Sequence, residues 1–170
     1  LVTGGAGYVG SHTCKHLAKN GFTPINIDRD LKTKFKPVNF GPSFDIHLPQ
    51  EIERLEEIIK RFNITSCIHF AGSASVSESV KNPSEYYKNN VIATVALLDK
   101  LIECGVKTFV YSSSAATYGD PGFRKCKESD TPNPISAYGG SKFMMEMICK
   151  DYLRAYNISS VGLRYFNAAG

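Results

Sequence analysis

Short apolar runs alternate with amphipathic helical segments along the whole chain, and this alternation constrains the fold more than any other feature of the sequence. Strand-like runs lie at residues 1–3, 24–27, 67–71, 109–112 and 161–165. Segments with apolar residues at helical spacing lie at residues 8–19, 49–62, 83–104 and 136–156. Strands separated by helices pair in parallel, because the helix supplies the crossover that parallel neighbours require. The pattern therefore predicts an α/β fold, built on a doubly wound parallel sheet with helices on both faces.

The composition indicates one ordered domain over residues 1–170. Of these residues 42% are hydrophobic and 21% are charged, which provides enough apolar side chain for a core. This balance excludes low-complexity, collagen-like and disordered chains. No apolar run approaches the ~20 residues of a membrane-spanning helix, so no membrane partner is expected. The net charge of +4, from 20 basic and 16 acidic residues, is too small and too scattered to indicate nucleic-acid binding.

The cysteines and the chain ends indicate the setting of this domain. The five cysteines are odd in number, widely spaced and without a C-x-x-C pair, so we expect reduced thiols in a cytoplasmic protein. The chain lacks an initiator methionine, opens on the end of an apparent strand and stops in a polar turn after another strand. We therefore expect it to be a piece of a longer protein.

Ligand-binding residues are expected at one edge of the sheet. In open parallel sheets, ligands bind at the carboxyl ends of the strands. The residues that follow the predicted strands are 4–10, 28, 72–79, 112–117 and 166–170. These segments are therefore the candidates for a binding site.

A glycine-rich segment directly follows the first strand and opens the first helix. Residues 3–10 read T-G-G-A-G-Y-V-G and fit the pattern T-G-x-x-G-x-x-G. Glycine lets the backbone turn sharply and approach a diphosphate, while the helix that follows offers unpaired N–H groups to the anion. A simple tight turn between strand and helix would use the same residues. Their place in the first βα unit favours a dinucleotide site of the Rossmann type, with Gly4, Gly7 and Gly10 at the diphosphate.

Asp28 indicates which dinucleotide binds. It ends the second strand, 18 residues after Gly10 and close to the ~20 expected for the acidic residue that binds the adenine ribose. Its carboxylate would repel a 2′-phosphate, so the cofactor is predicted to be NAD. Arg29 and Lys32 could each pair with such a phosphate, which keeps NADP as the alternative.

A second group of candidate residues combines Tyr138, Lys142 and Ser114. The tyrosine and lysine are four residues apart on a predicted helix, which puts phenol and ammonium on one face with Cβ atoms about 5–6 Å apart. A neighbouring cation favours the phenolate of a tyrosine, whose ordinary pKa is about 10. Such a pair also arises by chance on exposed helices. Ser114 favours a catalytic role, because it leaves the preceding strand at its carboxyl end and could bond a substrate hydroxyl alongside Tyr138.

Other polar residues indicate ordinary structural roles. His12 and His16 are spaced to share a metal ion, but no second ligand cluster accompanies them, so no metal site is expected. The basic stretches at residues 32–36 and 124–127 are most simply solvated loop charge. Met144, Met145 and Met147 lie on the helix of Tyr138 and are expected to pack against the sheet.

Taken in chain order, these motifs resemble a known enzyme family. The matching segments are residues 3–10, 28, 69–72, 78–80, 86–87, 89–90, 112–119, 138–142 and 163–167. They are similar, collinearly and over essentially all 170 residues, to the extended short-chain dehydrogenase/reductases and, within them, to the UDP-glucose 4-epimerases. The resemblance implies that residues 1–170 form the NAD-binding Rossmann domain of such an enzyme, roughly its N-terminal half, without most of the sugar-nucleotide domain.

The resemblance also implies a set of site residues. The catalytic group would be Ser114, Tyr138 and Lys142. The cofactor-binding residues would be Gly4, Gly7, Tyr8, Val9, Gly10, Asp28, Asp45, Ile46, Phe70, Ala71, Gly72, Asn89, Ser112, Tyr138, Lys142 and Phe166. The substrate-binding residues would be Ser114, Tyr138 and Asn167. Two departures from the family pattern are Ala74, where many relatives carry a lysine, and Ser77, which replaces the usual glycine.

The function implied by the resemblance is NAD-dependent epimerisation at carbon 4 of a UDP-hexose, through a transient 4-keto sugar. Tyr138 would remove the proton of the 4-hydroxyl, Lys142 would hold Tyr138 as phenolate, and Ser114 would orient the hydroxyl. In the family, the helix of Tyr138 and the helix that starts at Pro83 form a dimer interface, so a homodimer is expected. Facing a partner chain is then the alternative to sheet packing for some of the methionines on the helix of Tyr138. A UDP-pentose 4-epimerase, a 4,6-dehydratase and a non-catalytic NAD-binding module are the alternatives. A dehydratase needs an acid/base pair after the active-site residue, where this chain has Ala115 and Ala116.

Overall fold

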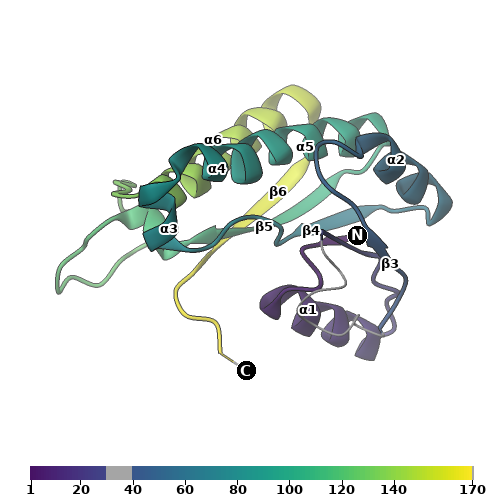
Figure 1. The fold of residues 1–170 in the computed structure, drawn as a ribbon, viewed down its shortest axis with the longest axis horizontal. Coiled ribbons are helices and arrows are strands. Elements are labelled where there is room, and N and C mark those ends of the chain that lie inside the picture. The colour runs from purple at the N-terminus through teal and green to yellow at the C-terminus, as the bar shows by residue number, and fades with distance from the viewer. Residues whose placement is uncertain (30–39, 170) are drawn as a thin grey trace.

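The computed structural model describes residues 1–29 and 40–169, and these form a layered α/β fold (Figure 1). The strands are β1 (Val2–Thr3), β2 (Asn26–Asp28), β3 (Ser43–Asp45), β4 (Ser66–His69), β5 (Thr108–Ser114) and β6 (Ser159–Tyr165). Within the described residues they form a six-stranded parallel sheet in the order β3-β2-β1-β4-β5-β6. This is the strand order of the Rossmann fold, so the predicted fold class is confirmed.

Helices cover both faces of the sheet. Helix α1 (Tyr8–Lys19) lies on one face, and α2 (Ile52–Arg61), α5 (Ala93–Glu103) and α6 (Ala137–Tyr156) lie on the other (Figure 1). The shorter helical segments are α3 (Val76–Lys81), α4 (Pro83–Tyr86), the π-helix η1 (Tyr87–Ile92) and the 3₁₀-helix η2 (Ala115–Tyr118). None of the described helices combines the length and apolarity required to cross a bilayer.

Local sequence signals explain where the long helices begin and end. The Ser136 side chain accepts a hydrogen bond from the Gly139 backbone N–H at 3.1 Å, which caps the start of α6. Asn157 ends the same helix in the left-handed conformation, with φ at 55°. Helix α1 stops before Gly21, whose φ of +81° a residue with a Cβ rarely adopts.

One helix departs from its predicted form. The sequence predicts a single helix over residues 83–104, whereas the structure divides this segment into α4, the π-turn η1 and α5. Pro83 starts it as expected. The wider turn holds Asn89 and Asn90, and Asn90 is completely buried. The spacing of apolar residues does not reveal the π-turn, because the helix continues on the same side of the sheet after it.

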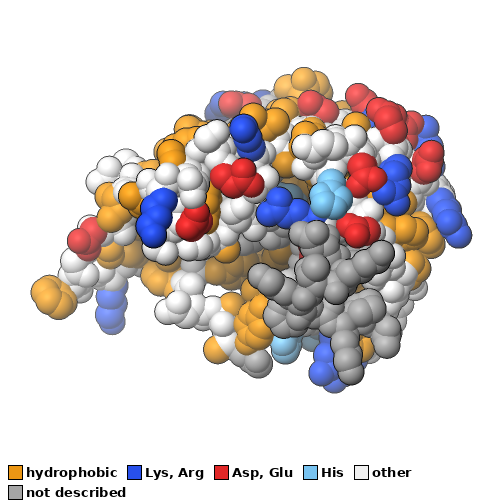
Figure 2. Space-filling view, in the orientation of Figure 1, with side chains coloured by type: hydrophobic (Ala, Val, Ile, Leu, Met, Phe, Trp, Pro, Cys, Tyr) orange, Lys and Arg blue, Asp and Glu red, His pale blue; other side chains and the backbone are white. Residues whose placement is uncertain are grey.

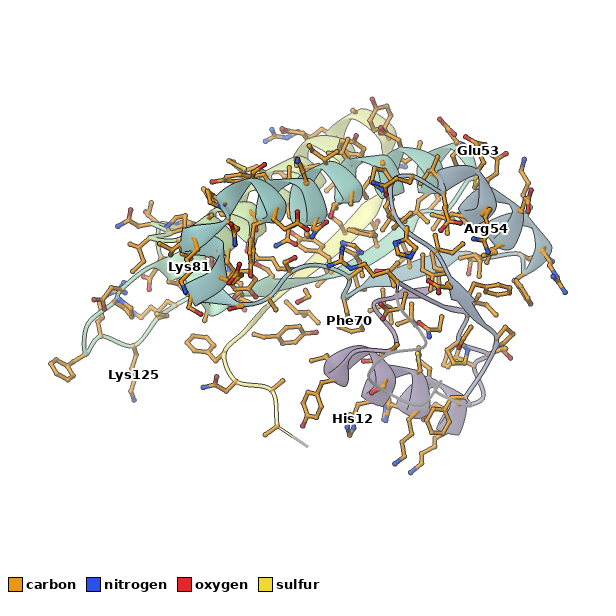
Figure 3. The ribbon with its side chains drawn as sticks, in the orientation of Figure 1. His12, Glu53, Arg54, Phe70, Lys81 and Lys125 are labelled. Atoms are coloured by element: carbon orange, nitrogen blue, oxygen red, sulfur yellow. The ribbon has the colours of Figure 1, made fainter. Side chains whose placement is uncertain are left out.

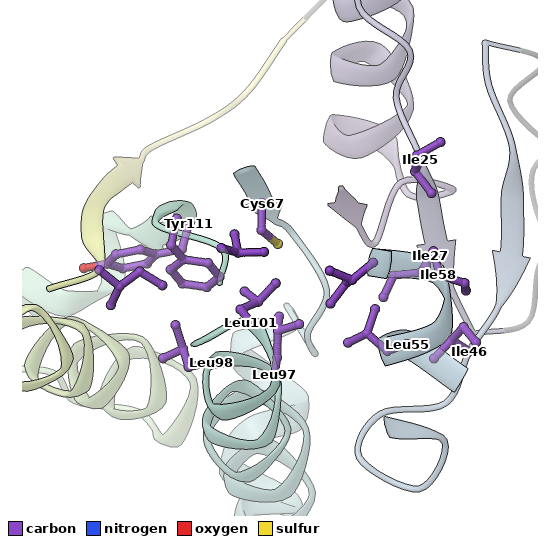
Figure 4. Close-up of a cluster of buried hydrophobic side chains, with 14 of the residues drawn as sticks. Ile25, Ile27, Ile46, Leu55, Ile58, Cys67, Leu97, Leu98, Leu101 and Tyr111 are labelled. Carbon is purple, nitrogen blue, oxygen red and sulfur yellow. The ribbon is translucent and has the colours of Figure 1, made fainter. Parts of the chain in front are cut away.

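The larger core lies between the sheet and the helices on one of its faces (Figure 4). Leu97, Leu98 and Leu101 of α5 are fully buried and lie near Leu55 of α2 and Cys67 of β4. This packing fixes α2, α5 and α6 against the sheet, so the carboxyl ends of the strands have defined positions. On the side of the molecule that Figure 2 presents, acidic and basic side chains are intermixed.

Candidate functional site

The strand order places a crevice between β1 and β4. The chain runs outward from β1 through β2 to β3, and then returns to the other side of β1 to form β4. The connections after β1 and β4 therefore leave in opposite directions, which opens the sheet edge between them for a ligand. The glycine-rich segment and residues 70–72 meet at this point.

The glycines are required by close backbone contacts. Gly4 has a φ of +68°, and a Cβ at this position would lie 2.6 Å from the backbone nitrogen of Ala71. In α1, a Cβ on Gly10 would lie 2.2 Å from the carbonyl oxygen of Gly4. Gly7 precedes the helix, and within residues 1–29 and 40–169 no side chain caps this end. The loop therefore presents bare backbone and the positive end of a helix dipole at the crevice, which suits a diphosphate.

Asp28 lies beside this loop. Its carboxylate accepts a hydrogen bond from the Ala6 backbone N–H at 2.9 Å, so the end of β2 is tied to the glycine-rich segment. Asp28 and Arg29 both line the crevice. Lys32, the other residue considered as a phosphate partner, lies outside the described residues.

This crevice is a cleft with about 780 Å³ of space, part of it open to solvent. Its walls come from the ends of β1, β2, β3 and β4 and from the π-turn. They are formed by Thr3, Gly4, Gly7, Ile27, Asp28, Arg29, Ile46, Leu48, His69, Phe70, Ala71, Gly72, Asn89 and Ala93. The chemistry fits a dinucleotide: glycine backbone for the diphosphate, a carboxylate for a ribose and aliphatic side chains for a flat base.

Lys142 connects α6 to this cleft. Its side chain is buried, and its Nζ donates a hydrogen bond to the Ser112 carbonyl oxygen at 2.9 Å. The same Nζ lies 3.8 Å from the position of a Cβ built on Gly72, which is in the cleft wall. Burial lowers the pKa of Lys142 to about 8. The amine is therefore a weaker base than an exposed lysine, and it lies where a bound cofactor would meet the end of β5.

Tyr138 lies one turn before Lys142 at the start of α6. The Lys142 Nζ is 6.0 Å from the centre of the Tyr138 ring, and the ring meets Tyr86 edge to face at 6.4 Å. A Cβ on Gly139 would lie 2.5 Å from the carbonyl oxygen of Ala116, so the start of α6 packs directly on the turn after β5. The structure thus brings Tyr138 beside the turn that Ser114 opens.

Ser114 caps that turn. Its side chain is almost buried, and its Oγ accepts a hydrogen bond from the Ala116 backbone N–H at 3.1 Å. The hydroxyl proton is therefore directed away from Ala116 and can be donated to another oxygen. The predicted catalytic group is thereby gathered at the carboxyl end of β5, next to the cleft.

A chain of buried hydrogen bonds underlies the cleft, and sequence reasoning did not assign it. Thr94 donates its hydroxyl proton to the Asn90 carbonyl oxygen at 2.8 Å, so its Oγ1 accepts from His69 Nε2 at 3.0 Å. The other ring nitrogen, Nδ1, then accepts from Thr3 Oγ1 at 2.6 Å. Burial, aided by the charge of Lys142, lowers the pKa of His69 to about 3. The imidazole is therefore neutral and structural.

Asn90 extends this chain to α6, the helix that carries Tyr138 and Lys142. Its Nδ2 donates to the Ser73 carbonyl oxygen and to Ser141 Oγ, both at 3.0 Å, and its Oδ1 accepts from the Ser73 N–H at 2.7 Å. Ser141 in turn donates to the Tyr138 carbonyl oxygen at 2.7 Å. The only hint in the sequence is a set of polar residues inside otherwise apolar segments.

Of the remaining predicted cofactor residues, some line the cleft and others lie outside it. Phe70 packs near Val2 and Cys14, on the same side of the sheet as α1, and Figure 3 shows it close to that helix, with His12 on the helix itself. Ile46 and Asn89 line the cleft. Asp45 is not among its lining residues, and its carboxylate lies 3.5 Å from His47 Nε2.

Tyr8, Val9, Phe166 and Asn167 are among the predicted residues that lie outside the cleft walls. Tyr8 and Val9 line a separate pocket between α1 and residues 168–169. Phe166 and Asn167 follow β6 and are exposed, and the Phe166 ring is 6.4 Å from the ring of Tyr118. Among the residues that the structure describes, no three histidine, cysteine or acidic side chains are grouped to hold a metal ion.

Comparisons with known proteins identify close relatives. A family model described as "NAD dependent epimerase/dehydratase family" matches residues 1–170. The UDP-glucose 4-epimerase of Rhizobium meliloti (strain 1021) is 42% identical over 172 aligned residues, which cover 100% of this chain and 52% of that protein. The chain thus spans about half the length of the curated relatives it matches.

Solved structures of UDP-glucose 4-epimerases are also similar to this chain. The UDP-glucose 4-epimerase of Brucella ovis in complex with NAD superposes with a TM-score of 0.93 at 41% identity, covering 99% of this chain and 52% of that one. The UDP-glucose 4-epimerase of Thermotoga maritima with UDP-glucose superposes with a TM-score of 0.90 at 33% identity, covering 99% and 55%.

Proposed function

This chain belongs to the NAD dependent epimerase/dehydratase family, and from that premise we propose that it is the NAD-binding domain of a UDP-hexose 4-epimerase. In this proposal the complete enzyme is an isomerase that interconverts UDP-glucose and UDP-galactose. One observation carries the proposal: the buried Lys142 amine bonds the end of β5 and reaches the glycine-lined cleft. Tyr138 and Ser114 lie beside it, which joins a cofactor site to an acid/base group.

The residues of the cleft suit the parts of NAD. The backbone of Gly4, Gly7 and Gly10 would face the diphosphate, because a side chain at Gly4 or Gly10 would collide with neighbouring backbone. Asp28 would bind the adenine ribose, and its charge would disfavour the extra phosphate of NADP. Ile46 would lie against the adenine.

A second group of residues would line the part of the cleft nearest the reacting end of the cofactor. Residues 70–72 and Asn89 lie farther along the cleft, in the direction of Lys142. When bound, NAD would take up the hydride from carbon 4 of the sugar and return it to the opposite face.

Side chains of the protein would carry out the proton transfer. Tyr138 would accept the proton of the 4-hydroxyl on its phenolate oxygen and later give it back. Lys142, one helical turn away, would stabilise that phenolate by its positive charge. Ser114 would donate its hydroxyl proton to the substrate oxygen, since the bond from the Ala116 N–H uses only an acceptor lone pair and leaves that proton available. Proton removal and orientation would thus come from three side chains at the end of β5.

The family relation also supports proposals about the sugar and nicotinamide contacts, the oligomeric state and the cellular location. Phe166 and Asn167, exposed after β6, would face the nicotinamide and the UDP-sugar in the complete protein. Exposed apolar side chains on the π-turn and α6, among them Tyr87, Ile92, Met144 and Met147, support a homodimer through these helices. The free cysteines suit the cytoplasm.

The test uses the full-length protein and UDP-galactose without added NAD. Conversion to UDP-glucose is the expected result, because the cofactor is regenerated in each cycle. A 4-keto-6-deoxy product would instead identify a dehydratase, and bound NAD without turnover would identify a binding module. Tyr138→Phe should abolish turnover and leave NAD bound. Tyr152→Phe, near the far end of the same helix, is the matched control and should retain activity.

A further inference from the structure

Glu146 is a partly buried carboxylate on the helix that carries Tyr138, with no role in the proposal above. It follows Lys142 by one turn of α6, and only 16% of its side chain is exposed. The carboxylate accepts hydrogen bonds from Arg164 Nε at 2.8 Å and from Arg164 Nη2 at 2.7 Å. A third bond comes from Ser113 Oγ, on the strand that ends in Ser114.

These contacts fasten α6 to β5 at two successive turns. Lys142 bonds the Ser112 carbonyl oxygen and Glu146 bonds the Ser113 side chain, so adjacent residues of the strand are held by adjacent turns of the helix. The next residue of the strand is Ser114. These two bonds thus link the strand that ends in Ser114 to the helix that carries Tyr138.

Arg164 extends the attachment to the third element of the site. Ser113 and Arg164 are paired across β5 and β6. The guanidinium lies 4.7 Å from the ring centre of Tyr118, in the turn that Ser114 caps. Burial opposes ionisation of Glu146, but the bonds from Arg164 and Ser113 outweigh it and leave the pKa of this carboxyl below its ordinary value. A charged Glu146 thus bonds α6, β5 and β6 at once.

We propose that Glu146 is a positioning residue: by holding Ser113, it sets Ser114 against Tyr138 and Lys142 for proton transfer. This inference rests on the proposed epimerase function. A purely structural ion pair would stabilise the fold without affecting the chemical step. The two roles differ in what happens to kcat when only the Ser113 bond is removed.

The experiment compares Ser113→Ala, Glu146→Gln and the double variant in the full-length protein, with UDP-galactose as substrate. Ser113→Ala removes one bond and leaves the ion pair, so it keeps the test usable if Glu146→Gln fails to fold. Each single variant should lower kcat about tenfold, which corresponds to about 1.4 kcal/mol, with KM and bound NAD nearly unchanged. The double variant should be no slower than Glu146→Gln alone, because both changes break one path.

Glu56→Gln is the matched control. Glu56 bonds Lys100 at 2.9 Å between α2 and α5, away from the site, so this variant should lower the melting temperature without lowering kcat. Unchanged kcat in Ser113→Ala, or effects that multiply in the double variant, would overturn the positioning role. Absence of turnover in the wild type would overturn the proposed function, and the inference with it.

Discussion

Replacing Lys142 with methionine should remove a pH-dependent destabilisation of the folded state, together with the amine to which we assign a role in proton transfer. The ordinary lysine pKa of 10.5 falls to about 8 in the folded protein because burial disfavours the charged amine. At 1.36 kcal/mol for each pKa unit, this difference corresponds to about 3 kcal/mol of destabilisation at neutral pH. Methionine has a similar length and carries no charge, so it would not bear this cost.

The sign of the pH dependence follows from proton counting. Between pH 8 and pH 10.5 the unfolded wild type holds more protons at this lysine than the folded protein does, so wild-type stability rises with pH across this interval. The variant lacks the group and lacks that rise. The stability of Lys142→Met relative to the wild type should therefore fall by about 2.5 kcal/mol from pH 7 to pH 10.

The assay is urea-induced unfolding of both proteins at several pH values. Comparing the two proteins at each pH cancels the other titrating groups. Losing the bond to the Ser112 carbonyl oxygen adds a constant offset to this difference, and the offset drops out of the change between pH 7 and pH 10. A difference in unfolding free energy that stays constant from pH 7 to pH 10 would refute the reasoning. It would mean that the amine is solvated or paired in the folded protein.

Two further substitutions and one pH titration have defined expected outcomes. Gly10→Ala should weaken NAD binding by at least tenfold in a titration, because its Cβ would lie 2.2 Å from a backbone oxygen; Gly140→Ala, where the nearest atom is 3.7 Å away, should bind normally. Leu97→Ala should cost about 2–5 kcal/mol in unfolding free energy, and Leu153→Ala on an exposed surface far less. The His69 ring should keep its neutral NMR chemical shifts from pH 8 to pH 4, since its pKa is about 3; a transition near pH 6 would contradict the buried bonds.

Features of the fold that depend on neighbouring residues were predicted correctly from the sequence. The alternation of apolar runs and helical stripes predicted a parallel α/β sheet, which the structure confirms. The glycine pattern predicted a tight turn, and the contacts at Gly4 and Gly10 explain why a side chain is excluded there. The helix from Ser136 was also predicted closely, because its capping serine and its asparagine stop are local signals.

The same reasoning failed where partners are far apart in the chain. The π-turn at residues 87–92 was predicted as regular helix, and the chain of bonds through His69, Thr94 and Asn90 was not predicted at all. Thr3 and His69 are 66 residues apart, and no spacing rule links them. Asp45 and Ile46 were predicted together from the family pattern: Ile46 lines the cleft, whereas the Asp45 carboxylate lies 3.5 Å from His47 Nε2, and its contact with a cofactor stays a prediction.

The sequence by itself determined the fold class, the glycine-lined turn and the Tyr138–Lys142 spacing, because each depends on a short-range period or a local backbone requirement. Only the tertiary structure decided that Lys142 is buried, that its amine bonds the Ser112 carbonyl oxygen, and that Glu146 joins three elements. The physical reason is that the charge of a side chain and its partners depend on desolvation and on contacts across the sheet. Those are properties of the packed chain, and neighbouring residues do not specify them.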